Sequence, residues 1–175
     1  MNDPEVRPDA ARRGFLTGKF LTEQGRQEVR ARTEVMGPPP PWFDVKSNHV
    51  PSVNWEQRCP QGIIRTYPQD HRRAGEPYLD FFIAGCTFCG LCADRPVAGD
   101  DRPRMGRALL DTSRCLAHNG VICVTCVVRC DARAIQRGPR GAVTVDEHGC
   151  IGCGACVAPC PASAIRVQPL TLGET

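Results

Sequence analysis

Hydrophobic residues in this chain stand in short runs separated by glycine, proline and charged residues. The β-branched runs at 142–145 and 165–167 predict two short strands. No run of 18 apolar residues occurs, so we expect no segment that spans a membrane. With 17 Gly and 16 Pro among 175 residues, the chain is rich in loops and can bury only a thin core, which favours stabilisation by covalent cross-links or bound metal at the cysteines.

The first 58 residues contain no cysteine and follow a different pattern. Residues 22–35 are predicted to form a helix with Thr22 as its N-cap. Four prolines at 38–41 end this helix and predict a polyproline II segment that leads into Trp42 and Phe43. This segment is either a stiff linker whose aromatic residues pack on the domain or an arm that docks on a partner protein.

Twelve cysteines suit a disulfide framework in a secreted protein, or metal binding in a reducing compartment. Residues 12–16, Arg-Arg-Gly-Phe-Leu, look like part of a twin-arginine export signal. The stretch that follows carries Lys19, Glu23 and Arg26, whereas a signal needs about 7–15 apolar residues and a cleavage site with small residues. We therefore expect a cytoplasmic protein with reduced thiols. The net charge of +3, without a block of like charge, gives no indication of a nucleic-acid partner.

Three segments of the cysteine-rich part share one frame, in which a cysteine is followed by four residues and then an isoleucine. They are Cys59–Ile64, Cys130–Ile135 and Cys160–Ile165. Pro60 and Pro161 follow their cysteines directly, where proline favours the start of a helix. We therefore predict repeated units made of a short strand, a cysteine loop, a short helix and a second strand.

The strongest motif is a run of four cysteines at spacings of two, two and three residues, followed by proline: Cys150, Cys153, Cys156 and Cys160. Bacterial ferredoxins bind [4Fe–4S] clusters with this run, and its fourth cysteine ligates the other cluster of a pair. Gly152 and Gly154 permit positive φ, so the loop can close around a cluster. A zinc site needs two pairs of cysteines, and this run exceeds that pattern.

A second run lies upstream, with Cys123, Cys126 and Cys130. Its first member is predicted to be Cys115, although seven residues separate Cys115 from Cys123. The alternative is that Cys115 is a buried free thiol. Because the fourth cysteine of each run ligates the other cluster, we predict two sets of ligands. One cluster is held by Cys115, Cys123, Cys126 and Cys160, and the other by Cys130, Cys150, Cys153 and Cys156.

The third run consists of Cys86, Cys89 and Cys92 and lacks a fourth cysteine. Cys59 with Pro60 has the form of a fourth cysteine whose own run is missing. We predict that these four cysteines hold a third cluster, because the twelve cysteines then divide into three sets of four. The alternative is a labile [3Fe–4S] centre at the run, with Cys59 left over.

Other chemistry is weakly represented in the sequence. The histidines stand in polar, loop-like sequence, and we expect them in solvent rather than bound to metal: His49, His71, His118 and His148. No Ser/His/Asp set, phosphate-binding loop or dinucleotide-binding fingerprint occurs. The sequence thus predicts a carrier or helper protein rather than an enzyme.

With these motifs the chain resembles the NapF family of ferredoxin-type proteins, which are accessory proteins of the periplasmic nitrate reductase system. The likeness covers most of the chain and includes residues 12–18, Trp42 with the prolines before it, and the start of the second run at 115–117. The family has four runs in two pairs, whereas here one run keeps only Cys59 and another lacks its last cysteine.

The resemblance implies a cytoplasmic protein that contacts NapA, the molybdenum-containing catalytic subunit, before NapA is exported. It implies a role in the maturation of NapA, in which a cluster or electrons are delivered. A general electron-transfer ferredoxin, or an electron-transfer subunit of another redox complex, is the alternative.

The expected fold is α+β, with ferredoxin-like, pseudo-symmetric (βαβ)2 units that bind clusters and a loop-rich, cysteine-free N-terminal arm. We predict three parts: the arm at 1–45, a degenerate ferredoxin unit at 46–112, and a ferredoxin-type domain with two [4Fe–4S] clusters at 113–175. Because metal binding supplies much of the folding energy in such a chain, we expect the apo-protein to be molten or disordered.

Overall fold

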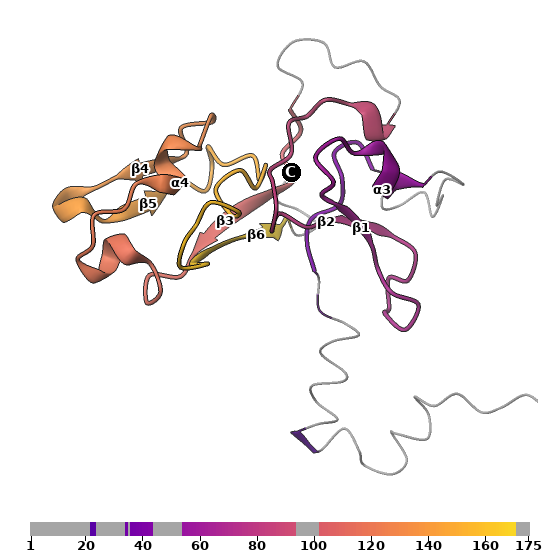
Figure 1. Ribbon diagram of the computed structural model, residues 1–175, viewed down its shortest axis with the longest axis horizontal. Helices are drawn as coiled ribbons and strands as arrows, with labels where there is room; N and C mark the ends of the chain where they lie inside the picture. Colours follow the sequence, from indigo (N-terminus) through magenta and orange to yellow (C-terminus); the bar gives the residue numbers. More distant parts are fainter. Residues whose placement is uncertain (1–21, 24–33, 35, 44–53, 94–101, 171–175) are drawn as a thin grey trace, which may run out of the picture. The chain divides into compact units, whose positions relative to one another are not determined.

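The computed structural model describes residues 22–23, 34, 36–43, 54–93 and 102–170 (Figure 1). The helix predicted over 22–35 therefore lies almost entirely outside the described residues. The chain divides into two units, which are Met1–Glu34 with Pro68–Ala74, and Val35–Tyr67 with Gly75–Thr175. The helices and strands named below belong to the second unit.

A small antiparallel sheet begins this unit and consists of β1 (Ile64–Thr66) and β2 (Pro77–Leu79) (Figure 1). The one-turn helix α3 (Trp55–Arg58) precedes β1, and the 3-10 helix η2 (Leu91–Ala93) follows β2. The core here is made of large side chains: Ile63, Ile64, Leu79, Phe81, Phe88 and Met105. We refer to these six residues as the β1–β2 core.

The proline segment packs against the β1–β2 core. Pro38 is buried, and the amide N–H of Leu79 donates a hydrogen bond of 2.8 Å to its carbonyl. Trp42 packs against the same core, and Phe43 lies edge-on to Trp55 with 5.7 Å between the ring centroids. The aromatic residues therefore pack on the domain, which is the arrangement that the linker alternative expected.

Four further strands form two nested antiparallel pairs. β3 (Gly106–Leu110) pairs with β6 (Ile165–Pro169), and between them in the sequence β4 (Ile135–Arg137) pairs with β5 (Val143–Val145). The connections hold three short helices: η3 (Leu116–Asn119), α4 (Thr125–Val128) and η4 (Pro139–Gly141). Short helices and small sheets together make the fold α+β.

Cysteines and small residues dominate the core of this second part, which we call the β3–β6 core. Its buried members are Ala108, Cys115, Ala117, Cys126, Ala134, Ile135, Val143, Cys150, Cys156, Ala164 and Ile165. Figure 1 shows β4, β5 and α4 together at one end of this part, with β3 and β6 beside them. The cysteine loops lie between the strand pairs and are positioned by them.

Both strands predicted from the β-branched runs are confirmed, as β5 and β6. Strands β2 and β3 were not predicted. β2 has only three residues and begins with proline, and β3 begins with glycine and arginine. Their pairing partners make them strands, because Tyr78 lies opposite Arg65 and Ala108 lies opposite Val167 in antiparallel register.

The three cysteine-to-isoleucine segments make a tight turn where a short helix was predicted, so that prediction is wrong. The third residue after each cysteine has positive φ: Gly62 (62°), Arg133 (53°) and Ser163 (46°). Its amide N–H donates to the carbonyl of the cysteine at 2.9, 2.9 and 3.1 Å. A left-handed residue does not continue a right-handed helix, so the chain turns and enters a strand. The isoleucine that opens each strand is buried.

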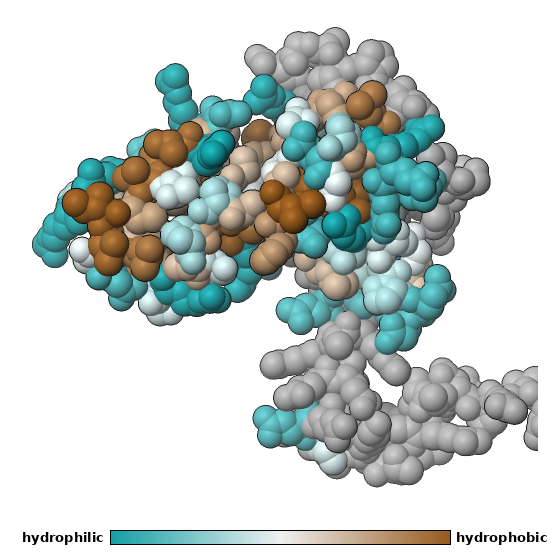
Figure 2. Space-filling view, viewed as in Figure 1, coloured by the Kyte–Doolittle hydropathy of each residue, from teal (hydrophilic) through white to brown (hydrophobic). Residues whose placement is uncertain are grey.

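Several hydrophobic side chains of this unit reach its surface, and Figure 2 shows brown patches on the face in view. Near the β1–β2 core they are Phe82, Ile83 and Leu91, and near α4 they are Val121, Ile122 and Val128. Within the described part of the chain, no helix has the length and apolar character needed to cross a bilayer.

Candidate metal-cluster sites

Three small cavities in the second unit are each lined by four cysteines. Site A has Cys59, Cys86, Cys89 and Cys92; site B has Cys115, Cys123, Cys126 and Cys160; site C has Cys130, Cys150, Cys153 and Cys156. The three sets share no member and together use all twelve cysteines. The folded chain thus groups the cysteines in the same sets that the spacing predicted, whereas their role as ligands stays a prediction.

Site C is enclosed by the loop 150–156. Gly152 and Gly154 have φ of 75° and 72°, which confirms the conformation expected for them. A Cβ on Gly152 would collide with the backbone of Gly106 in β3, so the loop can lie this close to the strand only with glycine there. The amide N–H of Ala108 in β3 points at Cys150 Sγ at 3.3 Å. Such N–H···S bonds stabilise a negatively charged sulfur ligand.

Site B contains the long gap between Cys115 and Cys123, and η3 fills it. The side-chain amide of Asn119 donates to the carbonyls of Cys115 and Ser113 at 2.8 and 3.0 Å. His118 Nε2 lies 2.8 Å from the carbonyl of Val143 in β5, so this nitrogen carries the proton and donates. The extra residues therefore fold back as one turn, and both cysteines line the same cavity.

Site A combines the loop 86–92 with Cys59, which directly follows α3. Phe88 and Gly90 have φ of 54° and 75°, and they stand at the same places in this loop as Gly152 and Gly154 do in site C. A non-glycine residue in this conformation is strained by roughly 1–2 kcal/mol. The buried Phe88 side chain and the contact of its N–H with Cys86 Sγ at 3.4 Å offset that strain.

Burial governs the protonation of these thiols when metal is absent. It raises the pKa of Cys86 in site A to about 12, with smaller increases from neighbouring thiols. It also raises the pKa of Cys156 in site C to about 12, and it raises the pKa of Cys126 in site B. Thiolates are the form that binds metal, so loading each site must release protons.

Four thiols around one cavity match the donor set of a [4Fe–4S] cluster. A single zinc ion also takes four cysteines, but it requires them within about 2.3 Å of one centre. Among the described residues, no group of three or more His, Cys, Asp or Glu is arranged to hold a single metal ion. Each set of four thiols is thus a donor set that could hold a larger inorganic group, such as a cubane cluster.

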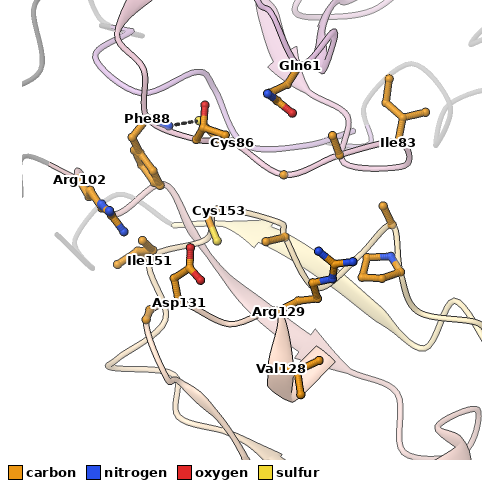
Figure 3. A pocket seen from close by; sticks show the side chains of 17 residues that line it. Gln61, Ile83, Cys86, Phe88, Arg102, Val128, Arg129, Asp131, Ile151 and Cys153 are labelled. Atoms are coloured by element: carbon orange, nitrogen blue, oxygen red, sulfur yellow. Dashed lines mark hydrogen bonds between the residues drawn. The ribbon is translucent and has the colours of Figure 1, made fainter. Parts of the chain in front are cut away.

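A groove of about 660 Å³ runs between sites A and C (Figure 3). Cys86 and Cys153 lie on its walls, and the amide N–H of Cys86 donates a hydrogen bond of 2.7 Å to the carbonyl of Cys153. Ile83, Val128 and Arg129 also line it. The described residues that line it include no serine or histidine.

The histidines differ in their surroundings. The expectation that His71 is in solvent is wrong, because its side chain is only 5% exposed. It lies in the first unit, where Nε2 lies 3.0 Å from the carbonyl of Glu34 and Nδ1 accepts the amide N–H of Arg73. His118 and His148 are exposed, as expected, and His49 lies outside the described residues.

The chain resembles several known proteins. A family model described as a 4Fe-4S binding domain matches residues 143–166. The chain is 30% identical to ferredoxin-type protein NapF of Escherichia coli (strain K12), over 93% of this chain and 96% of that protein. It is 33% identical to ferredoxin-type protein NapF of Haemophilus influenzae, over the same shares.

A third relative comes from another system. The methylamine utilization ferredoxin-type protein MauM of Methylorubrum extorquens is 28% identical, over 90% of this chain and 83% of MauM. All three relatives are described as ferredoxin-type proteins, and the family match spans three cysteines of site C and one of site B. The chain is thus a 4Fe–4S protein of ferredoxin type.

Proposed function

This chain belongs to the NapF family of ferredoxin-type proteins, and on that premise we propose that it binds the cytoplasmic precursor of NapA, the catalytic subunit of periplasmic nitrate reductase. It assists the maturation of NapA before export by delivering a cluster or electrons. It works in the cytoplasm as an accessory protein rather than as an enzyme.

The observation that carries this proposal is the grouping of all twelve cysteines around three cavities. We assign one [4Fe–4S] cluster to each of sites A, B and C, with their cysteines as ligands. Such clusters supply one-electron redox chemistry when bound. The chain's own residues hold the loops open with positive φ and direct N–H groups at sulfur, as Ala108 and Phe88 do.

Iron and acid-labile sulfide per chain, measured after anaerobic purification together with the EPR spectrum of the reduced protein, test the cluster assignment. About 12 irons with matching sulfide support three cubanes. About 8 irons would mean that site A does not hold a cubane, and would overturn the assignment there.

The proposed partner is tested by co-purification. The tagged protein is expected to retain the NapA precursor, whereas a variant that lacks sites B and C through Cys126→Ala and Cys156→Ala is not. Failure of the cluster-loaded protein to bind the NapA precursor would contradict the maturation role.

A second function, that of an electron carrier between a donor and a reductase, is favoured by the neighbouring positions of the sites. The Cys86–Cys153 hydrogen bond connects sites A and C, and Cys126 of site B and Cys156 of site C belong to the same buried core. The sites thus form a row in the order A, C, B. Rapid reduction by a general donor, without stable binding of the NapA precursor, would favour this carrier.

A further inference from the structure

We propose that site A holds the cluster that this protein hands over, that Cys89 is the ligand at which an acceptor thiol enters, and that sites B and C keep theirs. This inference rests on the proposed function, and it assigns the delivery to one site. Three independent observations carry it.

The first observation is exposure. Cys89 is exposed, and the other three cysteines of site A are half-buried. Sites B and C each have two buried cysteines, with Cys115 and Cys126 at 7% and 8% exposed and Cys150 and Cys156 at 8% and 7%. An incoming ligand can reach site A without opening the fold.

The second observation is how the cysteines are connected. Site B takes Cys160 from the end of the loop of site C, and site C takes Cys130 from the end of the loop of site B. The loop of each of these two sites therefore supplies one cysteine to the other site, so neither loop can move away alone. All four cysteines of site A come from outside sites B and C, so site A can empty without removing a ligand from either.

The third observation is the packing that remains when a site is empty. Ile63, Ile64 and Leu79 line site A and are 1%, 1% and 2% exposed. Each such side chain stabilises the fold by its burial, without bound metal. The β3–β6 core around sites B and C has four cysteines and four alanines among its eleven buried residues. Site A can thus be unloaded and reloaded while its surroundings stay folded.

The transfer itself is a ligand exchange without oxidation or reduction. A cysteine thiol of the acceptor loses its proton and forms an iron–sulfur bond at the iron next to Cys89. The bond from that iron to Cys89 Sγ breaks, and Cys89 leaves as a thiolate that takes up the proton. The same exchange at the three remaining ligands moves the whole cluster, with no net change in charge or electrons.

The experiment starts from anaerobic protein with about 12 irons, mixed with the apo-form of a small ferredoxin that binds one [4Fe–4S] cluster. Iron in the two proteins is followed over time, and iodoacetamide with mass spectrometry maps the cysteines that become free. We expect a fast phase that moves about four irons and alkylates the cysteines of site A only. Release in one phase from all sites, or fast alkylation at sites B or C, would overturn the inference.

A matched pair of variants tests the point of entry. Leu91 is 57% exposed and two residues from Cys89, and Val121 is 51% exposed and two residues from Cys123 of site B. In Leu91→Glu, the new carboxylate repels an approaching thiolate, and the fast phase is expected to slow about fivefold at low salt. Val121→Glu should leave it unchanged. Equal slowing in both variants, or none in Leu91→Glu, would contradict entry at Cys89.

The starting iron content keeps the two proposals apart. About 8 irons before mixing, with the cysteines of site A already open to iodoacetamide, would mean that three-cluster loading itself fails. With about 12 irons at the start, a failed transfer from site A counts against this inference alone, and binding of the NapA precursor is unaffected.

Discussion

The β1–β2 core and the β3–β6 core are built from different side chains, although each surrounds cysteine sites. The β1–β2 core contains Phe81, Phe88 and three large aliphatic residues besides Met105. In the β3–β6 core, cysteine and alanine supply eight of eleven buried residues, and the largest apolar members are Ile135, Ile165 and Val143. A core of large side chains is stable by burial, whereas a core of thiols and methyl groups depends on what the thiols bind.

Removal of all iron by anaerobic chelation should separate the two cores most clearly. The β3–β6 core is expected to lose its ordered packing, because the clusters that its cysteines bind are removed. The sheet of β1 and β2 is expected to keep most of its protection from hydrogen exchange. Hydrogen exchange followed by mass spectrometry measures both regions in one experiment. The sequence alone predicted a molten apo-protein throughout, and equal loss of protection in both regions would support that broader view.

Near-ultraviolet circular dichroism reports only on the part of the chain that contains the β1–β2 core. All tryptophans and tyrosines of the chain, Trp42, Trp55, Tyr67 and Tyr78, lie before β3. The rings of Tyr67 and Tyr78 are in contact, with 4.7 Å between their centroids and their planes tilted by 48°. A preserved aromatic signal in the apo-protein would therefore show that the part around site A stays folded, and hydrogen exchange is needed for the rest.

Loss of one cysteine should have different consequences in the two regions. Cys59→Ala removes a ligand from site A alone, and the iron content is expected to fall from about 12 to about 8 per chain. Cys130→Ala removes a ligand from site C and loosens the loop of site B, so the iron content should fall below about 8. Iron and sulfide analysis of both variants measures this, and identical losses would contradict the crossed arrangement of sites B and C.

The contact between the two regions is expected to be sensitive at Gly154. A Cβ there would collide with the ring of Phe81, and its φ of 72° adds backbone strain. Gly75 has a φ of 80° with nothing within 4 Å of an added Cβ, so Gly75→Ala measures the strain alone. Gly154→Ala should lower the free energy of unfolding of the loaded protein by about 1–3 kcal/mol more than Gly75→Ala does, as measured by thermal unfolding. Equal costs would mean that Phe81 moves aside freely.

The smallest effect is expected in the loop of site B. His118→Ala removes the hydrogen bond to the carbonyl of Val143, which contributes about 0.5–1.5 kcal/mol. The loop that carries Cys115 should loosen, and iron bound to site B should be released faster to a chelator. His148→Ala is the matched control, because His148 is exposed like His118 but its side chain makes no hydrogen bond to the described residues around site B. Equal rates of iron release from both variants would mean that His118 does not hold the loop of site B.

Local spacing made the cysteine sets predictable. Cysteines two residues apart must share one tight loop. The count of twelve then left Cys59 as the fourth cysteine for the incomplete run at 86–92. The same local logic predicted positive φ at Gly152 and Gly154. It failed at Arg133 and Ser163, because neither residue type signals a left-handed turn, and the sequence therefore favoured a helix where the chain turns.

Features that depend on distant segments were missed. Strand β3 has no clear strand pattern of its own and is ordered by its register with β6, in which Leu110 lies opposite Ile165. The burial of His71 depends on the carbonyl of Glu34, 37 residues away. No pattern within a short window contains this information.

The sequence by itself determined which cysteines belong together and the family to which the chain belongs, because both follow from spacing along the chain. The tertiary structure decided the order of the sites, the exposure of Cys89, and which site has large side chains beside it. These depend on contacts between segments far apart, such as the Cys86–Cys153 hydrogen bond and the packing of Pro38 on Leu79. Burial is a property of the folded whole, so only the structure separates one open site from two enclosed ones.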